Sequence, residues 1–383
     1  MKKSLLALAA LSAFATVAQA QSSVSVYGIM DMSYGENKVS GNPTDTNTNK
    51  AKNTKVTGLA DDAVNSSRIG FRGTEDIGGG VRAGFVVEAN LDMVRGATLD
   101  KANQTTETTT NKTGTAFLGS TRQTMLTLSD AKLGTLGVGY KKTLETDFND
   151  LYFTGTENSA GNQSHVAGRA TRANGIYYTS PTMSGVTITG LLVSGEATNE
   201  SAASADIAKT YDASMTQFGV NYSAGNLQVG AVYFNGSLKD NSAAATLISD
   251  VATADSYFKT GDNDYKGYGI GANYNFGFAK VTAQMGERKY GLSTDQKKNE
   301  YTTLGVTFPV GKLDLMAAYA MQEIKLNGVK QDETDGYQLI ARYNLSKRTN
   351  VYALVGENKK EVPTAGVADV KTSVARIGVA HSF

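Results

Sequence analysis

Residues 66–92 read SSRIGFRGTEDIGGGVRAGFVVEANLD and alternate between apolar and polar side chains on both sides of a glycine run. Before that run, Arg68 and Arg72 share one parity and Phe71 falls on the other. Because successive side chains of a strand point to opposite faces, this period of two indicates extended strands. The three consecutive glycines supply the positive backbone angles that a tight hairpin needs. The stretch therefore predicts a β-hairpin with one apolar face and one charged face.

The first twenty residues have the pattern of a secretory signal peptide. MKKSLLALAALSAFATVAQA carries two lysines, an apolar stretch over 5–17 and the small-residue pattern Ala18-Gln19-Ala20. The apolar stretch is shorter than the roughly 18 residues that a membrane helix needs, and a membrane anchor would not require the cleavage pattern. We therefore expect residues 1–20 to be removed and residues 21–383 to form the mature protein.

Composition and charge exclude several classes of protein. The chain has 37 lysines and arginines against 36 aspartates and glutamates, so no basic excess favours nucleic-acid binding. It has no cysteine, which excludes disulfides and thiolate metal sites. Its two histidines, His165 and His381, stand in no motif with a nucleophile, and no phosphate-binding or zinc-binding spacing occurs. We therefore expect neither catalysis nor a cofactor.

The same alternation recurs along the rest of the chain. The expected strands cover residues 23–36, 66–77, 81–93, 116–129, 135–142, 173–180, 186–195, 211–224, 227–237, 265–276, 279–290, 301–310, 312–325, 335–345, 350–358 and 371–383. Short connections follow the even-numbered segments, whereas long polar stretches such as 37–65, 94–115 and 238–264 follow odd-numbered ones. This rhythm is typical of outer-membrane barrels, whereas a soluble β-sandwich has shorter strands and more even loops. The sequence predicts an all-β fold, a 16-stranded antiparallel transmembrane β-barrel with short periplasmic turns and long external loops.

The two faces of the first and last expected strands differ in polarity. The apolar side chains expected to face lipid are Val24, Val26, Met30, Met32, Ile377 and Val379. The opposite parity, with Tyr27, Asp31 and Arg376, would line a water-filled lumen. Glycine, serine and threonine are common on the lumen parity, which favours an open bore. The alternatives are a barrel acting as an adhesin or structural anchor through its external loops, and a solute-specific channel with more strands.

Five segments carry a resemblance to a known family: SVSVYGIMDMSYG, SSRIGFRGTEDIGGGVRAGF, YYTSPTMSGV, LSKRTNVYAL and the closing SVARIGVAHSF. With them the chain resembles the general diffusion porins of Gram-negative bacteria, in particular the type found in relatives of Neisseria, Bordetella and Burkholderia. The resemblance implies a homotrimer in the outer membrane, with the third external loop folded inward. Each barrel would be a passive, water-filled channel for ions and small hydrophilic solutes. Contact with outer-membrane lipid and lipopolysaccharide is also implied.

The last strand ends on Phe383, with Val379 and Ile377 at alternate positions before it. In proteins that resemble this chain, a terminal aromatic strand of this kind is recognised by the barrel-assembly machinery. His381 departs from the tyrosine or hydrophobic residue usual at its position. The resemblance therefore implies an assembly signal at this end of the chain.

The resemblance also implies a constriction with an arginine wall opposite an acidic third loop, expected near 143–172. The wall candidates are Arg68, Arg72, Arg82, Arg122 and Lys141. The loop candidates are Glu145, Asp147, Asp150 and Glu157. Opposed charges across a narrow lumen favour small polar solutes and sort ions by sign. The lysines at 141 and 142 favour a weak anion preference; the alternative is that the arginines only neutralise carboxylates within the wall.

Overall fold

The structure is a computed structural model that describes residues 23–42, 52–61, 63–91, 93–94, 118–156, 172–199, 209–239, 248–249, 263–292, 295–361 and 369–383. The predicted signal peptide and Glu157 lie outside these residues. The first nine strands are β1 (Ser23–Asn42), β2 (Lys52–Asp61), β3 (Arg68–Gly78), β4 (Val81–Leu91), β5 (Leu118–Asp130), β6 (Gly134–Lys142), β7 (Arg172–Thr179), β8 (Val186–Asn199) and β9 (Lys209–Ala224). The others are β10 (Leu227–Lys239), β11 (Ile248–Ser249), β12 (Asn263–Asn275), β13 (Lys280–Leu292), β14 (Asp295–Val310), β15 (Leu313–Leu326), β16 (Val329–Asn344), β17 (Thr349–Glu361) and β18 (Val370–Ser382). A helix, α2 (Leu144–Leu151), follows β6. No helix among the described residues is long and apolar enough to cross a bilayer.

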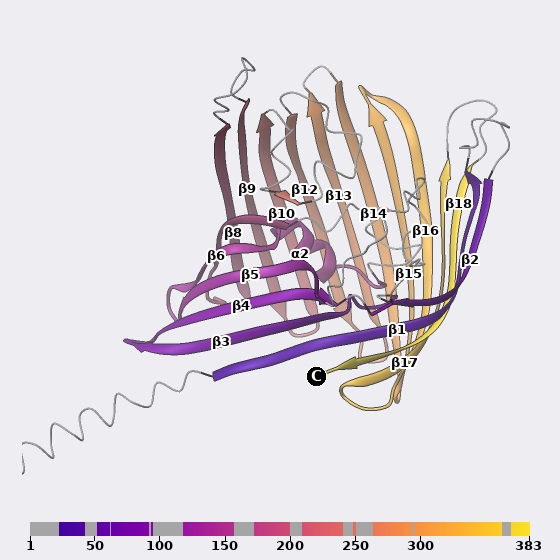
Figure 1. The fold of residues 1–383 in the computed structure, drawn as a ribbon, viewed down its shortest axis with the longest axis horizontal. Helices are drawn as coiled ribbons and strands as arrows, with labels where there is room; N and C mark the ends of the chain where they lie inside the picture. Colours follow the sequence, from indigo (N-terminus) through magenta and orange to yellow (C-terminus); the bar gives the residue numbers. More distant parts are fainter. Residues whose placement is uncertain are drawn as a thin grey trace, which may run out of the picture.

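The eighteen strands occupy sixteen positions in the wall of a closed barrel (Figure 1). β2 and β3 share one position, because β1 pairs with β3 through its residues 23–29 and with β2 through 32–42. The two-residue strand β11 has no wall position of its own, because it pairs with β7 and because β10 pairs directly with β12. β18 pairs antiparallel with β1 and closes the sheet, so the predicted sixteen-stranded antiparallel barrel is confirmed.

The carboxyl end of the chain forms part of this closure. Gly28 and Phe383 exchange two backbone hydrogen bonds of 3.1 Å, each N–H donating to the other residue's carbonyl. A Cβ atom on Gly28 would overlap the Phe383 ring, so the absence of a side chain allows the ring to lie against β1. The terminal aromatic residue therefore holds the two ends of the barrel together.

The turns at one end of the barrel match the prediction, whereas two connections at the other end do not. The turn after β3 contains Gly78, Gly79 and Gly80 with φ of 90°, 65° and 86°, as a tight hairpin requires. At the opposite end, only residues 293–294 separate β13 from β14, and Asn327-Gly328 joins β15 to β16. The φ values of Asn327 and Gly328, 50° and 83°, are those that an Asn-Gly hairpin needs. The prediction of long loops is wrong for these two connections, because the four strands that they join continue past the apolar band with charged side chains.

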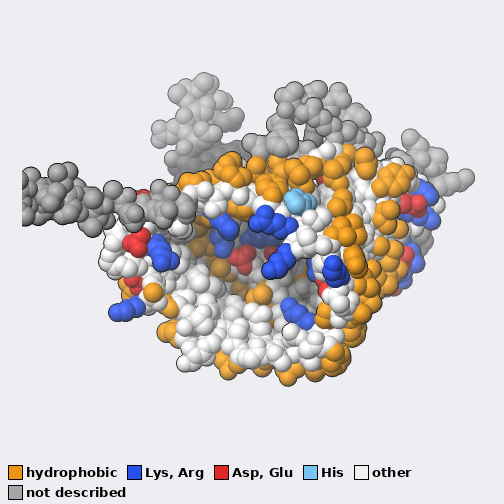
Figure 2. All heavy atoms as spheres, turned by 90° about the horizontal axis from the view of Figure 1, so that it is seen from below, with side chains coloured by type: hydrophobic (Ala, Val, Ile, Leu, Met, Phe, Trp, Pro, Cys, Tyr) orange, Lys and Arg blue, Asp and Glu red, His pale blue; other side chains and the backbone are white. Residues whose placement is uncertain are grey.

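A similar correction applies to the stretch 37–65. The expected solvated loop is wrong here, because β1 continues to Asn42 and pairs with β2. The polar composition that suggested a loop belongs to strand ends that lie above the apolar band. The outer face below them is apolar, with Val24, Val26, Ile377 and Val379 exposed as predicted. Figure 2 shows hydrophobic side chains around the outside of the barrel.

Candidate pore constriction

α2 lies inside the barrel, where it contacts β8, β9, β10 and β12 (Figure 1). Thr143 caps its first turn, since its side-chain oxygen accepts from the Thr146 N–H at 3.4 Å. Glu145 and Asp147 add negative charge near the amino end, which the helix dipole favours. The segment after β6 is therefore folded inward, as the resemblance implied.

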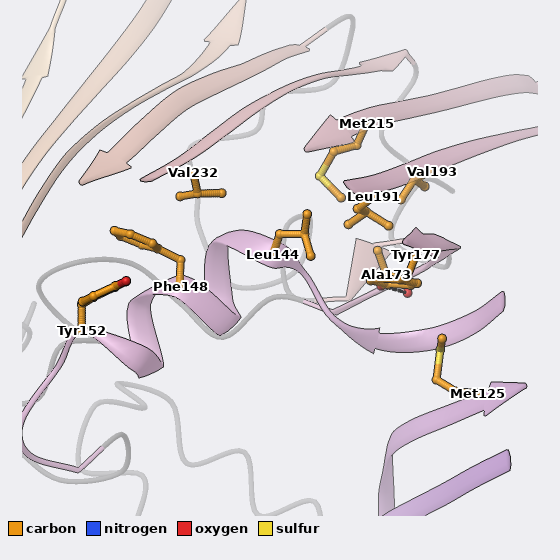
Figure 3. Close-up of a cluster of buried hydrophobic side chains, with 10 residues drawn as sticks. All are labelled: Met125, Leu144, Phe148, Tyr152, Ala173, Tyr177, Leu191, Val193, Met215 and Val232. Atoms are coloured by element: carbon orange, nitrogen blue, oxygen red, sulfur yellow. Dashed lines mark hydrogen bonds between the residues drawn. The ribbon is translucent and has the colours of Figure 1, made fainter. Parts of the chain in front are cut away.

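Apolar side chains attach α2 to the lumen side of the wall. Leu144, Phe148 and Tyr152 are buried on the wall-facing side of the segment (Figure 3). The wall residues of the same cluster include Leu191, Val193, Met215 and Val232. Burying side chains of this size contributes about 2 kcal/mol each, so this cluster alone favours the docked loop.

Glycines of the wall make room for two of these aromatic rings. A Cβ atom on Gly269 would overlap Phe148, and one on Gly271 would overlap Tyr152. The Tyr152 hydroxyl donates to Asn221 Oδ1 at 2.9 Å, and burial raises the pKa of Tyr152 to about 12, which keeps that donor proton. The lumen glycines, which the sequence suggested would widen the bore, here form a trough that receives the loop.

An ion pair anchors the helix beside this trough. Glu145 is 1% exposed, and its Oε1 accepts a hydrogen bond of 2.8 Å from Nε of Arg288 on β13. The Tyr265 hydroxyl donates to the other carboxylate oxygen, and the Glu145 N–H donates to Gln217 at 3.0 Å. Glu145 was predicted to face the arginine wall across the pore. The structure instead buries its side chain against the opposite wall, where its contacts with Arg288, Tyr265 and Gln217 hold the helix.

The chain beyond α2 continues along the same wall. Asn273 donates to the Leu151 carbonyl at 3.0 Å, the hydroxyls of Thr154 and Thr282 form a hydrogen bond, and the Thr156 N–H donates to Gln338 at 2.8 Å. These contacts lead the segment from β12 to β16. It therefore covers a large part of the lumen wall and narrows the space that remains.

The two other described loop carboxylates pair with lysines of β6. Asp147 lies 3.0 Å from the Lys141 ammonium, and Asp150 pairs with Lys142. Lys141 also lies 5.1 Å from the centre of the Tyr177 ring. These carboxylates are therefore balanced by adjacent cations on the same side of the lumen, and they provide less of a transverse field than predicted.

Three of the four arginines predicted for the wall, Arg68, Arg72 and Arg122, lie together in the structure. Arg122 donates from Nε to Glu88 Oε1 at 2.7 Å, and Arg68 Nε lies 3.8 Å from Glu88 Oε2. Arg72 lies over the Tyr27 ring, 5.0 Å from its centre. Glu88 was not predicted as a site residue, although it shares the lumen parity of β4 with Arg82.

A β-bulge turns Arg122 into this cluster. Leu126 and Leu128 are exposed on the outer face of β5, and strict alternation would place Arg122 on that same face. The pairing of β4 with β5 shifts register between Glu88 and Ala89, opposite Arg122. Such a bulge re-aims a side chain, and Arg122 accordingly lies on the lumen side, 8% exposed.

Arg82, the fourth predicted wall arginine, lies elsewhere. It is exposed two residues after the glycine turn and is paired in register with Asp76. Six residues of extended strand, roughly 20 Å, separate it from Glu88. The structure therefore does not bring Arg82 to the constriction.

A second inward segment, which sequence reasoning missed, covers the lumen side of β15–β18. Asp31 is fully buried and accepts from the backbone N–H groups of Val64 and Asn65 at 3.3 and 2.7 Å, and from the Asn65 side chain at 3.1 Å. The Tyr352 hydroxyl donates to its other oxygen. Ala63 and Val64 pack on a cluster with Ile340, Leu354 and Val374. We call residues 63–67 the lumen turn; it leads directly into Arg68.

Seen from the end with the short turns, Lys and Arg side chains gather in the central hollow (Figure 2). Within the described part of the chain, no group of three His, Cys, Asp or Glu side chains could hold a metal ion. The site is thus a narrowed, water-accessible passage lined by charged groups. Its arrangement suits the sorting of solutes by size and charge.

Comparison with known proteins identifies the family of this barrel. A family profile described as Gram-negative porin matches residues 7–362. Outer membrane porin protein 32 of Delftia acidovorans is 30% identical, and an outer membrane porin protein of Bordetella pertussis is 27% identical, each over the full length of both chains. Among solved structures, the anion-selective porin from Comamonas acidovorans superposes with a TM-score of 0.62 at 22% identity, covering 95% of this chain and 100% of that one. The chain belongs to the Gram-negative porins, and it forms an outer-membrane channel for the passive diffusion of ions and small hydrophilic solutes.

Proposed function

We propose that the channel is weakly anion-selective and that Arg72, with Arg68 and Arg122, provides the charge that attracts anions. The observation that carries this proposal is the position of Arg72. Its side chain is exposed on the lumen parity of β3, and its guanidinium lies over the Tyr27 ring. Among the described residues no carboxylate forms a salt bridge with it. A stacked guanidinium keeps its N–H edges available to oxyanions and halides in the lumen.

The balance of nearby charges supports the same sign. Lys141, Lys142 and Arg288 each pair with one loop carboxylate, so these three pairs cancel locally. Among the described residues of the arginine wall, Arg68 and Arg122 share the carboxylate of Glu88, while Arg72 lies over the Tyr27 ring. A modest positive excess therefore remains beside the open part of the lumen, and a modest excess predicts weak selectivity.

The test is the reversal potential of purified protein in a planar bilayer under a KCl gradient. We expect a reversal potential of the sign that chloride permeation produces. A cation-selective reversal would contradict the proposed sign while leaving the channel itself intact. A bilayer that stays silent with folded, heat-modifiable protein would favour the adhesin or anchor alternative.

We also propose a homotrimer. A solved OmpT of Vibrio cholerae described as a trimer form has a TM-score of 0.59 to this chain at 15% identity, which supports the shared barrel fold. Openings that occur in groups of three equal steps, and a crosslinked species of three chains, are the expected results.

Three further proposals concern the path to the membrane and the lipid around the barrel. Residues 1–20 act as a cleaved signal peptide, and Ile377, Val379 and Phe383 form the signal for the barrel-assembly machinery. Lipopolysaccharide contacts the outer strand ends. Support for the last comes from ion pairs at the strand ends above the apolar band, such as Lys298 with Glu300 and Lys325 with Glu323. Charged side chains at this level match the polar headgroup region.

A further inference from the structure

A groove crosses the apolar outer face of the barrel from β14 to β17. Its floor contains three small side chains on neighbouring strands: Ala341 pairs directly with Ala353, and Ala317 lies diagonally beside Ala341. Larger exposed side chains form its sides, namely Phe308, Leu315, Leu339 and Val355. The groove has a volume of about 350 Å³, and every residue that lines it is apolar. This volume lies within the range of pockets that bind small ligands.

The groove lies inside the band of the wall that spans the membrane. Tyr343 is exposed on the same outer face, two residues after Ala341, and Tyr337 is exposed four residues before it. Exposed tyrosines of this kind are typical of the two membrane–water interfaces. Ala341 is only three residues, roughly 10 Å, from the end of β16 at Asn344. The groove therefore faces lipid chains and lies nearer the end of the barrel with the short turns.

The two short turns beside the groove carry three exposed cations. Lys312 belongs to the turn between β14 and β15, and Lys347 and Arg348 belong to the turn between β16 and β17. The Asn344 N–H donates to the Lys312 carbonyl at 2.8 Å, which holds the two turns side by side. Within the described part of the chain, no carboxylate forms a salt bridge with any of the three. Asp314 pairs instead with an arginine of β16 on the lumen side.

We propose that the groove holds an acyl chain of an anionic phospholipid, whose phosphate binds Lys312, Lys347 and Arg348. Lysines and arginines at a membrane surface attract anionic headgroups, and the apolar groove begins about one glycerol backbone away from them. A phospholipid with a net negative charge, such as phosphatidylglycerol, matches both halves of the site. The short turns are periplasmic, so this lipid belongs to the inner leaflet of the outer membrane. Lipopolysaccharide would place its phosphates at the opposite end of the barrel. The inference does not depend on the ion selectivity proposed above.

The experiment uses purified full-length protein in phosphatidylcholine vesicles. The vesicles contain a trace of phosphatidylglycerol that carries a photoreactive diazirine in one acyl chain, or of phosphatidylcholine labelled in the same way. After irradiation, mass spectrometry of peptides shows where each probe has reacted. We expect the phosphatidylglycerol probe to label β15–β17 about fivefold more than the phosphatidylcholine probe does. The other outer strands should react equally with both probes.

Two variants separate the two halves of the site. Ala341→Leu/Ala353→Leu fills the groove and should remove the excess labelling of β15–β17. Its control is Ala272→Leu on β12, which adds the same side chain to the outer face between the exposed residues Ile270 and Tyr274.

The second variant, Lys312→Gln/Lys347→Gln/Arg348→Gln, removes the three cations and should make the two probes label β15–β17 equally. Its control is Lys132→Gln, which removes an exposed cation from the turn between β5 and β6. Both control variants should keep the wild-type preference for the phosphatidylglycerol probe.

Equal labelling of β15–β17 by both probes in the wild type would overturn the inference. Excess labelling that survives in the filled variant would also overturn it, because the chain would then lie elsewhere. If the probes do not reach β15–β17 and the filled variant loses its oligomeric state, the groove is a contact between copies of this chain, which again overturns the inference. If the filled variant does not fold, the charge variant decides: loss of the excess labelling supports the proposal, and its persistence overturns it.

Discussion

Arg288 on β13 and Glu145 on α2 are 143 residues apart in the chain, and Nε of the arginine donates to the carboxylate at 2.8 Å. Both side chains are buried, and the pair fixes the helix that narrows the lumen. The width of the pore therefore depends on an interaction between a strand and a segment that the sequence suggested would face the opposite way.

Replacing Arg288 with methionine should loosen α2. The change leaves a buried carboxylate without its cation, which costs about 3 kcal/mol or more. We expect a larger and noisier single-channel conductance, because the helix can leave the wall. The double variant Arg288→Met/Glu145→Gln removes both charges and should show a smaller effect. A conductance as steady as wild type in the single variant would mean that the apolar cluster alone holds the loop.

The glycine trough gives a second prediction about pore width. Gly271→Ala places a methyl group where the Tyr152 ring lies, so the ring and the loop must move toward the lumen. We expect a reduced conductance with the barrel still folded. Gly190→Ala is the matched control, because a Cβ atom there has no neighbour within 4 Å. Equal conductance of the two variants would show that Tyr152 can shift without affecting the bore.

Asp31 should stabilise the lumen turn, because it accepts hydrogen bonds from that turn and from the wall. Asp31→Ala removes the acceptor for the N–H groups of Val64 and Asn65 and for the Tyr352 hydroxyl. Each buried donor left without a partner costs about 1–3 kcal/mol of folding free energy, so we expect the barrel to unfold at a clearly lower temperature. Tyr352→Phe removes one donor and should cost about 1 kcal/mol. The check is the temperature at which the folded band disappears in a gel, and indistinguishable temperatures for the two variants would contradict this account.

The regular part of this fold could be predicted from sequence, because a strand's polarity pattern repeats every two residues. That rule placed all sixteen wall positions and the glycine turns. It stopped where the outer face becomes charged, so β1 and β16 are longer than the pattern predicts, and β2 lies in a stretch that was predicted to be a loop. The Asn327-Gly328 pair was the available signal for a tight hairpin there, and the polar residues around it obscured it.

The site was harder to predict, for three physical reasons. Alternation applies to strands, whereas Glu145 and Asp147 lie on α2, so the sequence could not show which of the two carboxylates meets a buried arginine. A bulge changes the parity locally, and the inward direction of Arg122 depends on one. The lumen turn is held by long-range hydrogen bonds to Asp31, and no local pattern encodes such a contact.

The carboxyl-terminal residue has a structural role that can be tested apart from recognition by the assembly machinery. Phe383→Ala removes the ring that lies against Gly28 but keeps the two backbone hydrogen bonds. We expect slower refolding in detergent, where no assembly machinery is present, and a lower unfolding temperature. Phe383→Leu should recover part of the loss. Wild-type behaviour of the alanine variant in detergent would restrict the role of Phe383 to recognition in the cell.

The most direct test of the central claim is the reversal potential of Arg72→Gln beside that of Arg82→Gln. Both changes remove one lumen arginine, but Arg72 lies over Tyr27 at the arginine wall and Arg82 lies near the turn. We predict that Arg72→Gln shifts the reversal potential toward that of a non-selective pore, while Arg82→Gln stays close to wild type. Equal shifts in both variants, or a shift only in Arg82→Gln, would contradict the assignment of the constriction.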